Sequence, residues 1–183
     1  MKKLFALFLA ASLLLGLACA ASAESEWADY TCEEQSFSTK IPVNGTTGYD
    51  DDVKGAIIYT GVAGYIPYVI VQRRPMDMKF SNPENYLLNV YREHLENTHG
   101  DNFLGMNDDL NWEIGGKALL GARYKYKIGE YTVVQLELIE IRDAGDVEYT
   151  AKFIEGEDEA TMAALEEAVR NYQETDTVPA TGT

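Results

Sequence analysis

The sequence predicts an α+β fold in which helices pack on a mostly antiparallel sheet. Residues 118–154 contain three consecutive runs in which apolar and polar residues alternate, as they do in half-buried strands. Shorter apolar runs precede them, between residues 37 and 72. Two segments, near residues 82–100 and 157–172, repeat apolar residues at helical spacing. Because each predicted helix has a single apolar face, each is expected to pack on the sheet.

The first 23 residues have the pattern of a bacterial signal peptide. Lys2 and Lys3 precede an uncharged apolar run that is too short for a spanning helix of about 20 residues. The small residues 21–23, Ala-Ser-Ala, then form a cleavage site. We therefore predict a secreted or extracytoplasmic protein. The alternative is a lipid anchor at Cys19, which would hold the protein at the cell surface.

The composition excludes several classes of protein. The chain has 30 acidic and 15 basic residues, a net charge of −15 and a pI near 4.4. Such an acidic surface repels nucleic-acid phosphates and anionic lipids. Apolar residues make up 46% of the chain, which is too many for a disordered acidic segment.

The first half of the chain contains short strands. Residues 37–41 alternate and stop at Pro42, while residues 55–60 and 68–72 are apolar runs bounded by Gly and Pro. Cys32, which precedes them, is expected to be a buried apolar residue and not a reactive thiol.

The first helix begins at Asn82, which is a suitable N-cap before Pro83, and ends at Gly100. Its predicted apolar face is formed by residues 87, 90, 91, 94, 95 and 98. His94 is therefore expected to pack in the core or at its rim.

A three-stranded antiparallel meander follows, over residues 118–154. Gly129-Glu130 provides a two-residue link of the type II′ kind. The apolar face of the second strand changes between Leu138 and Ile139, which predicts a β-bulge. On the first strand Arg123, Lys125 and Lys127 form a solvated basic face, which we expect opposite acids such as Glu137 and Glu148.

The closing helix begins near residues 157–159, where acids favour the positive end of the helix dipole. It ends at Tyr172, and residues 173–183 are predicted to be a disordered tail. Residues 24–172 therefore form one domain.

This order of elements resembles the PsbP-like family. The resemblance rests on residues 37–42, the amphipathic helix in mid-chain, the segment Ile114-Gly115-Gly116-Lys117-Ala118 and the closing helix. It implies an α/β/α sandwich, which this family shares with a nuclear import factor. It also implies an exported, non-catalytic accessory or binding domain, with no catalytic residue to transfer to this chain.

Loop acids are the candidate metal ligands. Asp50 and Asp52 lie in one loop, and Asp108 and Asp109 lie in another. Calcium binds several carboxylates at once, so a calcium site is possible here, although residues 50–61 do not match an EF-hand loop. Acids that only keep these loops solvated are the alternative, and no other cofactor is expected.

The candidate binding patch is the uncharged segment 61–68. If its side chains point outward, Tyr65, Ile66 and Tyr68 form a ligand-binding surface. If they point inward, the segment covers an edge of the core.

Two functions therefore compete. The first is an exported non-catalytic accessory or binding domain for an unknown protein or small ligand in the cell envelope. The alternative is a secreted hydrolase or calcium-dependent protein that uses loop carboxylates. A cavity that gathers three or more titratable residues from distant segments would favour the enzyme. Scattered acids on a shallow surface would favour the binding domain.

Overall fold

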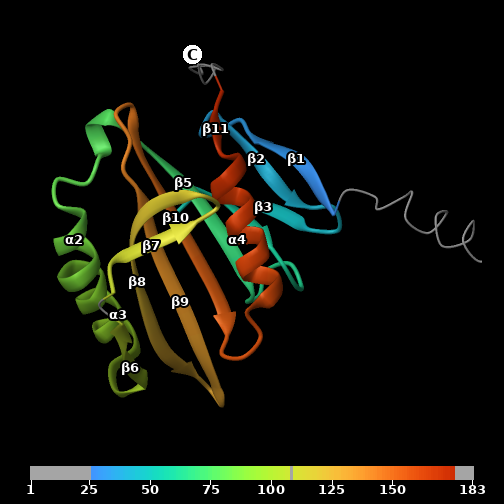
Figure 1. The fold of residues 1–183 in the computed structure, drawn as a ribbon. Coiled ribbons are helices and arrows are strands. Elements are labelled where there is room, and N and C mark those ends of the chain that lie inside the picture. Colours follow the sequence, from blue (N-terminus) through green and yellow to red (C-terminus); the bar gives the residue numbers. More distant parts are fainter. Residues whose placement is uncertain (1–25, 108, 176–183) are drawn as a thin grey trace, which may run out of the picture.

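A computed structural model describes residues 26–107 and 109–175, which form three layers (Figure 1). A large antiparallel sheet lies in the middle. A helical segment covers one face, and helix α4 (Glu159–Asn171) with a small three-stranded sheet covers the other. The predicted α+β class with helices packed on a mostly antiparallel sheet is confirmed. No helix within the described ranges is both long and apolar enough to cross a membrane.

The large sheet has eight strands, and every pair in it is antiparallel. Its order is β3-β4-β5-β10-β9-β8-β6, and β7 also pairs with β8. The strands are β3 (Thr46–Asp50), β4 (Gly55–Tyr59), β5 (Tyr68–Pro75), β6 (Phe103–Asn107), β7 (Asn111–Ile114), β8 (Lys117–Ile128), β9 (Tyr131–Glu140) and β10 (Gly145–Ile154). The small sheet has the order β1-β2-β11 and contains β1 (Trp27–Cys32), β2 (Phe37–Pro42) and β11 (Gln173–Glu174).

The meander is formed by β8, β9 and β10, as the alternating pattern predicts. At the link between β8 and β9, Gly129 has a φ of +60° whereas Glu130 does not have a positive φ. This combination is the one that a type II′ turn requires.

The predicted bulge in β9 is wrong. β9 pairs residue for residue with both neighbours, and no register shift is recorded between Leu138 and Ile139. The apolar pattern changes because β9 is a central strand that is covered on both faces. Leu138 packs in the core beneath α4, and Ile139 packs in a second core beneath the helical segment.

The helical segment consists of α2 (Pro83–Asn85), the π-helical turn η2 (Tyr86–Tyr91) and α3 (Arg92–His99). It is preceded by a 3₁₀ turn, η1 (Met76–Met78), and followed by another, η3 (Gly100–Asn102). The Asn82 side chain accepts a hydrogen bond from the Asn85 backbone at 2.9 Å, which confirms the predicted cap. Gly100 ends α3 with a φ of +52°.

The chain does not leave the fold at residue 173, where the disordered tail was predicted to begin. Gln173 and Glu174 form β11 and pair with Ser38 and Phe37 of β2. Two ion pairs hold Glu174, one to Arg73 at 3.1 Å and one to Arg142 at 3.2 Å. The predicted signal peptide and Cys19 lie outside the described residues.

Candidate functional site

A cavity of about 340 Å³ opens beside the helical segment, on the sheet face that this segment partly covers. η2 and α3 contact β8 and β6, toward one edge of the sheet. The cavity lies over β5 and β10, where residues from β5, η2, β9 and β10 meet. Its titratable lining includes Arg74, Tyr86, Tyr91, Glu137, Glu148 and Lys152.

Glu137 lies at the wall of this cavity and is only 1% exposed. Its two carboxyl oxygens accept hydrogen bonds from the Thr150 hydroxyl at 2.9 and 3.1 Å, and the Gln135 amide donates to one of them at 3.3 Å. Burial raises the pKa of Glu137 well above its ordinary value, and the neighbouring carboxylate of Glu148 raises it further. Both effects favour the protonated form of Glu137.

Glu148 is also buried, but it is paired. The Arg74 guanidinium lies 2.5 Å from its carboxylate, and the Tyr86 hydroxyl donates to it at 3.0 Å. The guanidinium also lies over the Phe80 ring, 4.4 Å from its centre, which holds it in place. The charge of Glu148 is thus balanced inside the protein.

The π-helical turn brings two tyrosines to the same polar cluster. In an α-helix, residues five apart, such as Tyr86 and Tyr91, would lie about 140° apart around the axis. The wider turn of η2 places their rings side by side, with 5.5 Å between centres. The Tyr91 hydroxyl accepts a hydrogen bond from the Gln135 amide at 2.5 Å. Burial, followed by the charge of Glu137, raises the pKa of Tyr91.

Two lysines also line the cavity, and neither makes an ion pair with an acid among residues 26–107 and 109–175. Lys152 of β10 lies half-buried beside the Tyr68 ring, with its ammonium 5.8 Å from the ring centre. Burial lowers the pKa of Lys152, but Tyr126, Tyr68 and Glu137 together raise it above its ordinary value. Lys54 lies exposed in the turn between β3 and β4.

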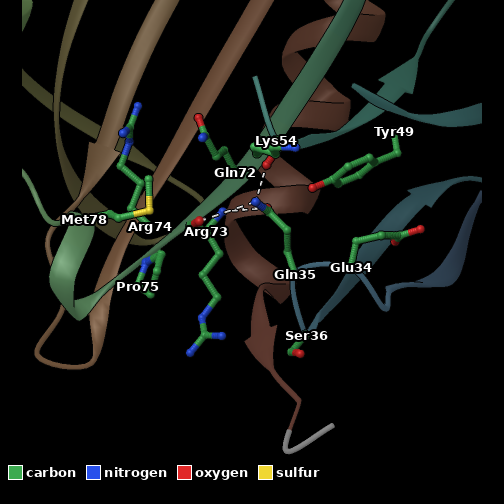
Figure 2. A pocket seen from close by; sticks show the side chains of 10 residues that line it. All are labelled: Glu34, Gln35, Ser36, Tyr49, Lys54, Gln72, Arg73, Arg74, Pro75 and Met78. Carbon is green, nitrogen blue, oxygen red and sulfur yellow. Dashed lines mark hydrogen bonds between the residues drawn. The ribbon is translucent and has the colours of Figure 1, made fainter. Parts of the chain in front are cut away.

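A second cavity of about 340 Å³ adjoins the first and shares Lys54, Gln72, Arg74 and Met78 with it. Figure 2 shows Gln72 and Arg74 on one side of β5 and Arg73 on the other. Gln35 bridges the two sheets here: its amide oxygen accepts from the Arg73 backbone at 2.8 Å, and its amide group donates to the Lys54 carbonyl. This side chain fixes the turn that carries Lys54.

The predicted binding patch is divided by the fold. Tyr65 is 70% exposed, and Val62 of the same loop is 71% exposed. Ile66 packs against the second core, and Tyr68 lies in β5 with its ring edge-on to Tyr59 at 6.1 Å. Of the three predicted residues, only Tyr65 points fully outward, while the Tyr68 ring lies beside Lys152.

The acidic loops are separated. Asp50 and Asp52 adjoin β3, at one edge of the large sheet, whereas Asp109 follows β6 at the other edge, and Asp108 lies outside the described residues. Asp50 instead accepts hydrogen bonds from the backbone of Asp52 and Val53 at 2.9 and 3.1 Å, which stabilises its own turn. Within the described part of the chain, no three His, Cys, Asp or Glu side chains are placed to hold a metal ion.

The histidines lie outside the cavity lining. His94 is exposed, so the prediction that it packs in the core or at its rim is wrong. The helical segment turns Leu87 and Leu95 inward instead. His99 stacks on the Tyr126 ring with 3.8 Å between centres, and burial lowers its pKa. Cys32 is fully buried, as expected.

Four site residues are not predicted as such by the sequence: Gln135, Glu137, Glu148 and Lys152. Glu137 was placed on a solvated face with the bases of β8, but it pairs with Ala122 and lies on the opposite, covered face. One feature of the sequence could have identified these buried polar residues. Tyr124 and Tyr126 lie on the apolar face of their strand, and a buried tyrosine hydroxyl needs a polar partner nearby.

Comparison with known proteins identifies the fold. No known protein family matches the sequence, and no curated protein does. Among solved structures, CyanoP, the PsbP of the cyanobacterium Synechocystis sp. PCC 6803, is similar over 84% of this chain and 95% of its own, with a TM-score of 0.50 and 8% identity. A mutant of protein Mog1 is similar over 82% and 97%, with a TM-score of 0.50 and 13% identity.

A protein from Bacteroides thetaiotaomicron is similar over 81% of this chain, with a TM-score of 0.51 and 11% identity. This chain spans 48% of that protein, about half of its length. At these identities the likeness concerns the fold alone. The fold is PsbP-like, as the resemblance in the sequence implies.

Proposed function

We propose that this protein is an exported, non-catalytic binding domain and that the cavity beside the helical segment holds a small polar ligand. The observation that carries the proposal is the convergence of polar groups from four elements on one open cavity. A volume of about 340 Å³ lies at the lower end of the range for small-molecule sites. Export rests on the sequence pattern of residues 1–23.

The bonding within the cavity favours binding over catalysis. The cavity gathers more than three titratable residues from distant segments, so the criterion set for an enzyme is met. However, the two buried acids already have partners: Thr150 and Gln135 donate to Glu137, while Arg74 and Tyr86 hold Glu148. A general base needs a free oxygen directed at the substrate.

One observation supports the enzyme alternative. Glu137 has a raised pKa next to a second buried carboxylate, and such pairs can divide acid and base roles. A hydrolase of this kind would use the two sheet residues instead of the loop carboxylates considered in the sequence analysis.

The proposal is tested by titrating the protein with galactose, galactosamine, galacturonate, acetate and inorganic phosphate, with backbone amide NMR shifts as the readout. We expect at least one compound to shift the signals of residues that line the cavity. Gln72→Trp should abolish these shifts, because Gln72 lies on the cavity floor and the larger ring fills the space. Asn111→Trp is the matched control, since Asn111 is an exposed neutral residue of β7 outside the cavity.

Two results would contradict the proposal. If no compound shifts cavity residues at high millimolar concentration, the cavity is not a binding site. If a bound compound is hydrolysed, and Glu137→Gln stops hydrolysis without loss of binding, the enzyme alternative replaces the binding domain.

A further inference from the structure

We infer that the ligand of this cavity is a small anion and that Lys152, with Lys54 at the mouth, recognises its carboxylate or phosphate group. This inference rests on the proposed function, because it assigns the charge of the ligand that the cavity would hold. It goes further by naming the residues that bind the charged group of the ligand.

Lys152 is the first reason. Two other half-buried bases of the large sheet are balanced by acids: Arg74 pairs with Glu148 at 2.5 Å, and Lys117 pairs with Glu140 at 3.2 Å. Lys152 has no such partner among the described residues, although it is half-buried and lines the cavity. A charge withdrawn from water is costly unless an opposite charge accompanies it. An anion in the cavity would supply that charge.

The charge of the cavity as a whole is the second reason. Three acids line it, but Glu148 is paired with Arg74, and burial raises the pKa of Glu137 well above its ordinary value. The third, Asp52, is exposed. While Glu137 keeps its proton, the positive charges of Lys152 and Lys54 outnumber the negative charge of Asp52, within a chain of net charge −15. A cationic pocket in an acidic protein favours anions locally.

The backbone of Lys54 is the third reason. Its φ is +56°, in the left-handed region that a residue with a Cβ atom rarely adopts. The Gln35 amide holds this conformation by donating to the Lys54 carbonyl. Glycine would adopt the same backbone without strain, so a lysine here points to a use for its side chain.

The inference predicts how binding depends on pH. Titratable and polar groups from several elements face Glu137. They are Glu148, Thr150 and Lys152 of β10, Gln135 of β9, Tyr124 and Tyr126 of β8, and Tyr86 and Tyr91 of η2. Arg74 of β5 pairs with Glu148. If Glu137 ionises, it adds a negative charge beside the bound anion. Anion affinity should therefore fall as the pH rises and Glu137 loses its proton.

The test compares three hexoses that differ in charge: galacturonate, galactose and galactosamine. Glucose 6-phosphate and inorganic phosphate distinguish a phosphate ligand from a carboxylate ligand. We expect an anionic member to bind at least tenfold more tightly than galactose, a factor equivalent to about 1.4 kcal/mol, and galactosamine to bind most weakly. Affinity is measured by calorimetry, and the location by amide NMR shifts.

Four variants locate the charge. Lys152→Met should weaken anion binding at least tenfold, because it removes the half-buried positive charge of the cavity. Lys54→Met should weaken it less, since Lys54 is exposed. Lys127→Met is the matched control, because Lys127 is an exposed lysine of β8 outside the cavity. Glu137→Gln should retain anion binding and remove its dependence on pH.

The possible results separate the two proposals. If galactose or galactosamine binds in the cavity more tightly than the anions, the inference is overturned while the proposed function stands. If Lys152→Met binds the anions as well as Lys127→Met does, Lys152 does not recognise them and the inference also fails. If neither these compounds nor acetate shifts the signals of cavity residues, the proposed function itself fails.

Discussion

Glu137 shows how far the environment of one residue can differ from what its local sequence indicates. It alternates with Leu136 and Leu138, which is the pattern of a strand with one solvated face. The helical segment packs over that face, so Glu137 is buried with polar partners. Glu137, a polar residue of this alternating pattern, therefore lines a cavity beside the helical segment.

Replacing Glu137 with Gln tests this burial through the pH dependence of stability. The pKa of Glu137 is higher in the folded chain than its ordinary value of 4.5. The stability that this proton provides is therefore complete below that value and is lost as the pH rises through the folded-state pKa. We expect the free energy of unfolding of the wild type to fall with pH in this window, at up to about 1.4 kcal/mol per pH unit.

Glu137→Gln should remove that slope, because the amide does not titrate. The measurement is urea unfolding of both proteins across the window. Equal slopes for the two proteins would mean that Glu137 is ionised in the folded state at moderate pH.

Tyr65 and Tyr68 separate the two interpretations of segment 61–68. Because Tyr65 is 70% exposed, Tyr65→Ala should change the free energy of unfolding by less than about 0.5 kcal/mol. Tyr68 packs on Tyr59 and beside Lys152, so Tyr68→Ala should cost roughly 1–3 kcal/mol. Urea unfolding checks both values. A large loss of stability for Tyr65→Ala, with binding kept, would exclude Tyr65 as part of a binding patch.

Among the elements, the π-helical turn η2 is the one that forms the site. Helical spacing alone predicts a continuous α-helix, and such a helix would direct Tyr86 and Tyr91 to different sides. In the wider turn both hydroxyls reach the buried polar groups, at Glu148 and Gln135. The π-helical turn therefore brings both tyrosines to the polar cluster. Such turns are frequent at functional sites.

The turn between β7 and β8 is closely packed against α4, and its two glycines allow a matched test. Both have positive φ, +61° at Gly115 and +77° at Gly116. A Cβ at Gly115 would lie 2.8 Å from the Arg170 backbone nitrogen and 2.9 Å from the Glu166 carbonyl, whereas a Cβ at Gly116 would meet nothing within 4 Å.

We therefore expect Gly116→Ala to cost roughly 1–2 kcal/mol, from backbone strain alone. Gly115→Ala should cost about 1–3 kcal/mol more, because α4 must move away from the turn. Thermal unfolding of the two variants measures the difference. Equal losses would show that α4 is not packed on this turn as closely as described.

In the whole molecule, the central sheet separates two cores. The larger core lies between the sheet, α4 and the small sheet, and the smaller one lies beneath the helical segment. The site lies on the side of the smaller core, where polar groups replace part of the apolar packing. Many acids of the described residues lie exposed in loops and on helix surfaces, such as Asp52, Glu93 and Glu157.

The net charge of −15 predicts how salts affect stability. Added sodium chloride should raise the melting temperature, because it screens repulsion between the acids. The calcium hypothesis requires a further rise when millimolar calcium replaces sodium at the same ionic strength. Differential scanning calorimetry in matched solutions provides the measurement, with magnesium as a control. If calcium adds nothing, Asp50, Asp52, Asp108 and Asp109 do not bind it.

The sequence by itself determined the α+β class, the meander, the helix cap at Asn82 and the burial of Cys32. These features depend on residues that are close in the chain, where spacing and local hydrogen bonds decide the structure. The binding patch at Tyr65, Ile66 and Tyr68 was also proposed from local composition, and the fold placed its residues in different surroundings.

Only the tertiary structure decided which polar strand face is covered. Glu137 and Lys125 have similar alternating neighbours, yet Glu137 lies beside the helical segment and Lys125 lies on the opposite face, paired with Glu155 at 2.5 Å. That difference arises from where a distant helix packs, which alternation within a strand does not specify. The cavity and its lysines exist because β5, η2, β9 and β10 meet, although they lie far apart in the sequence.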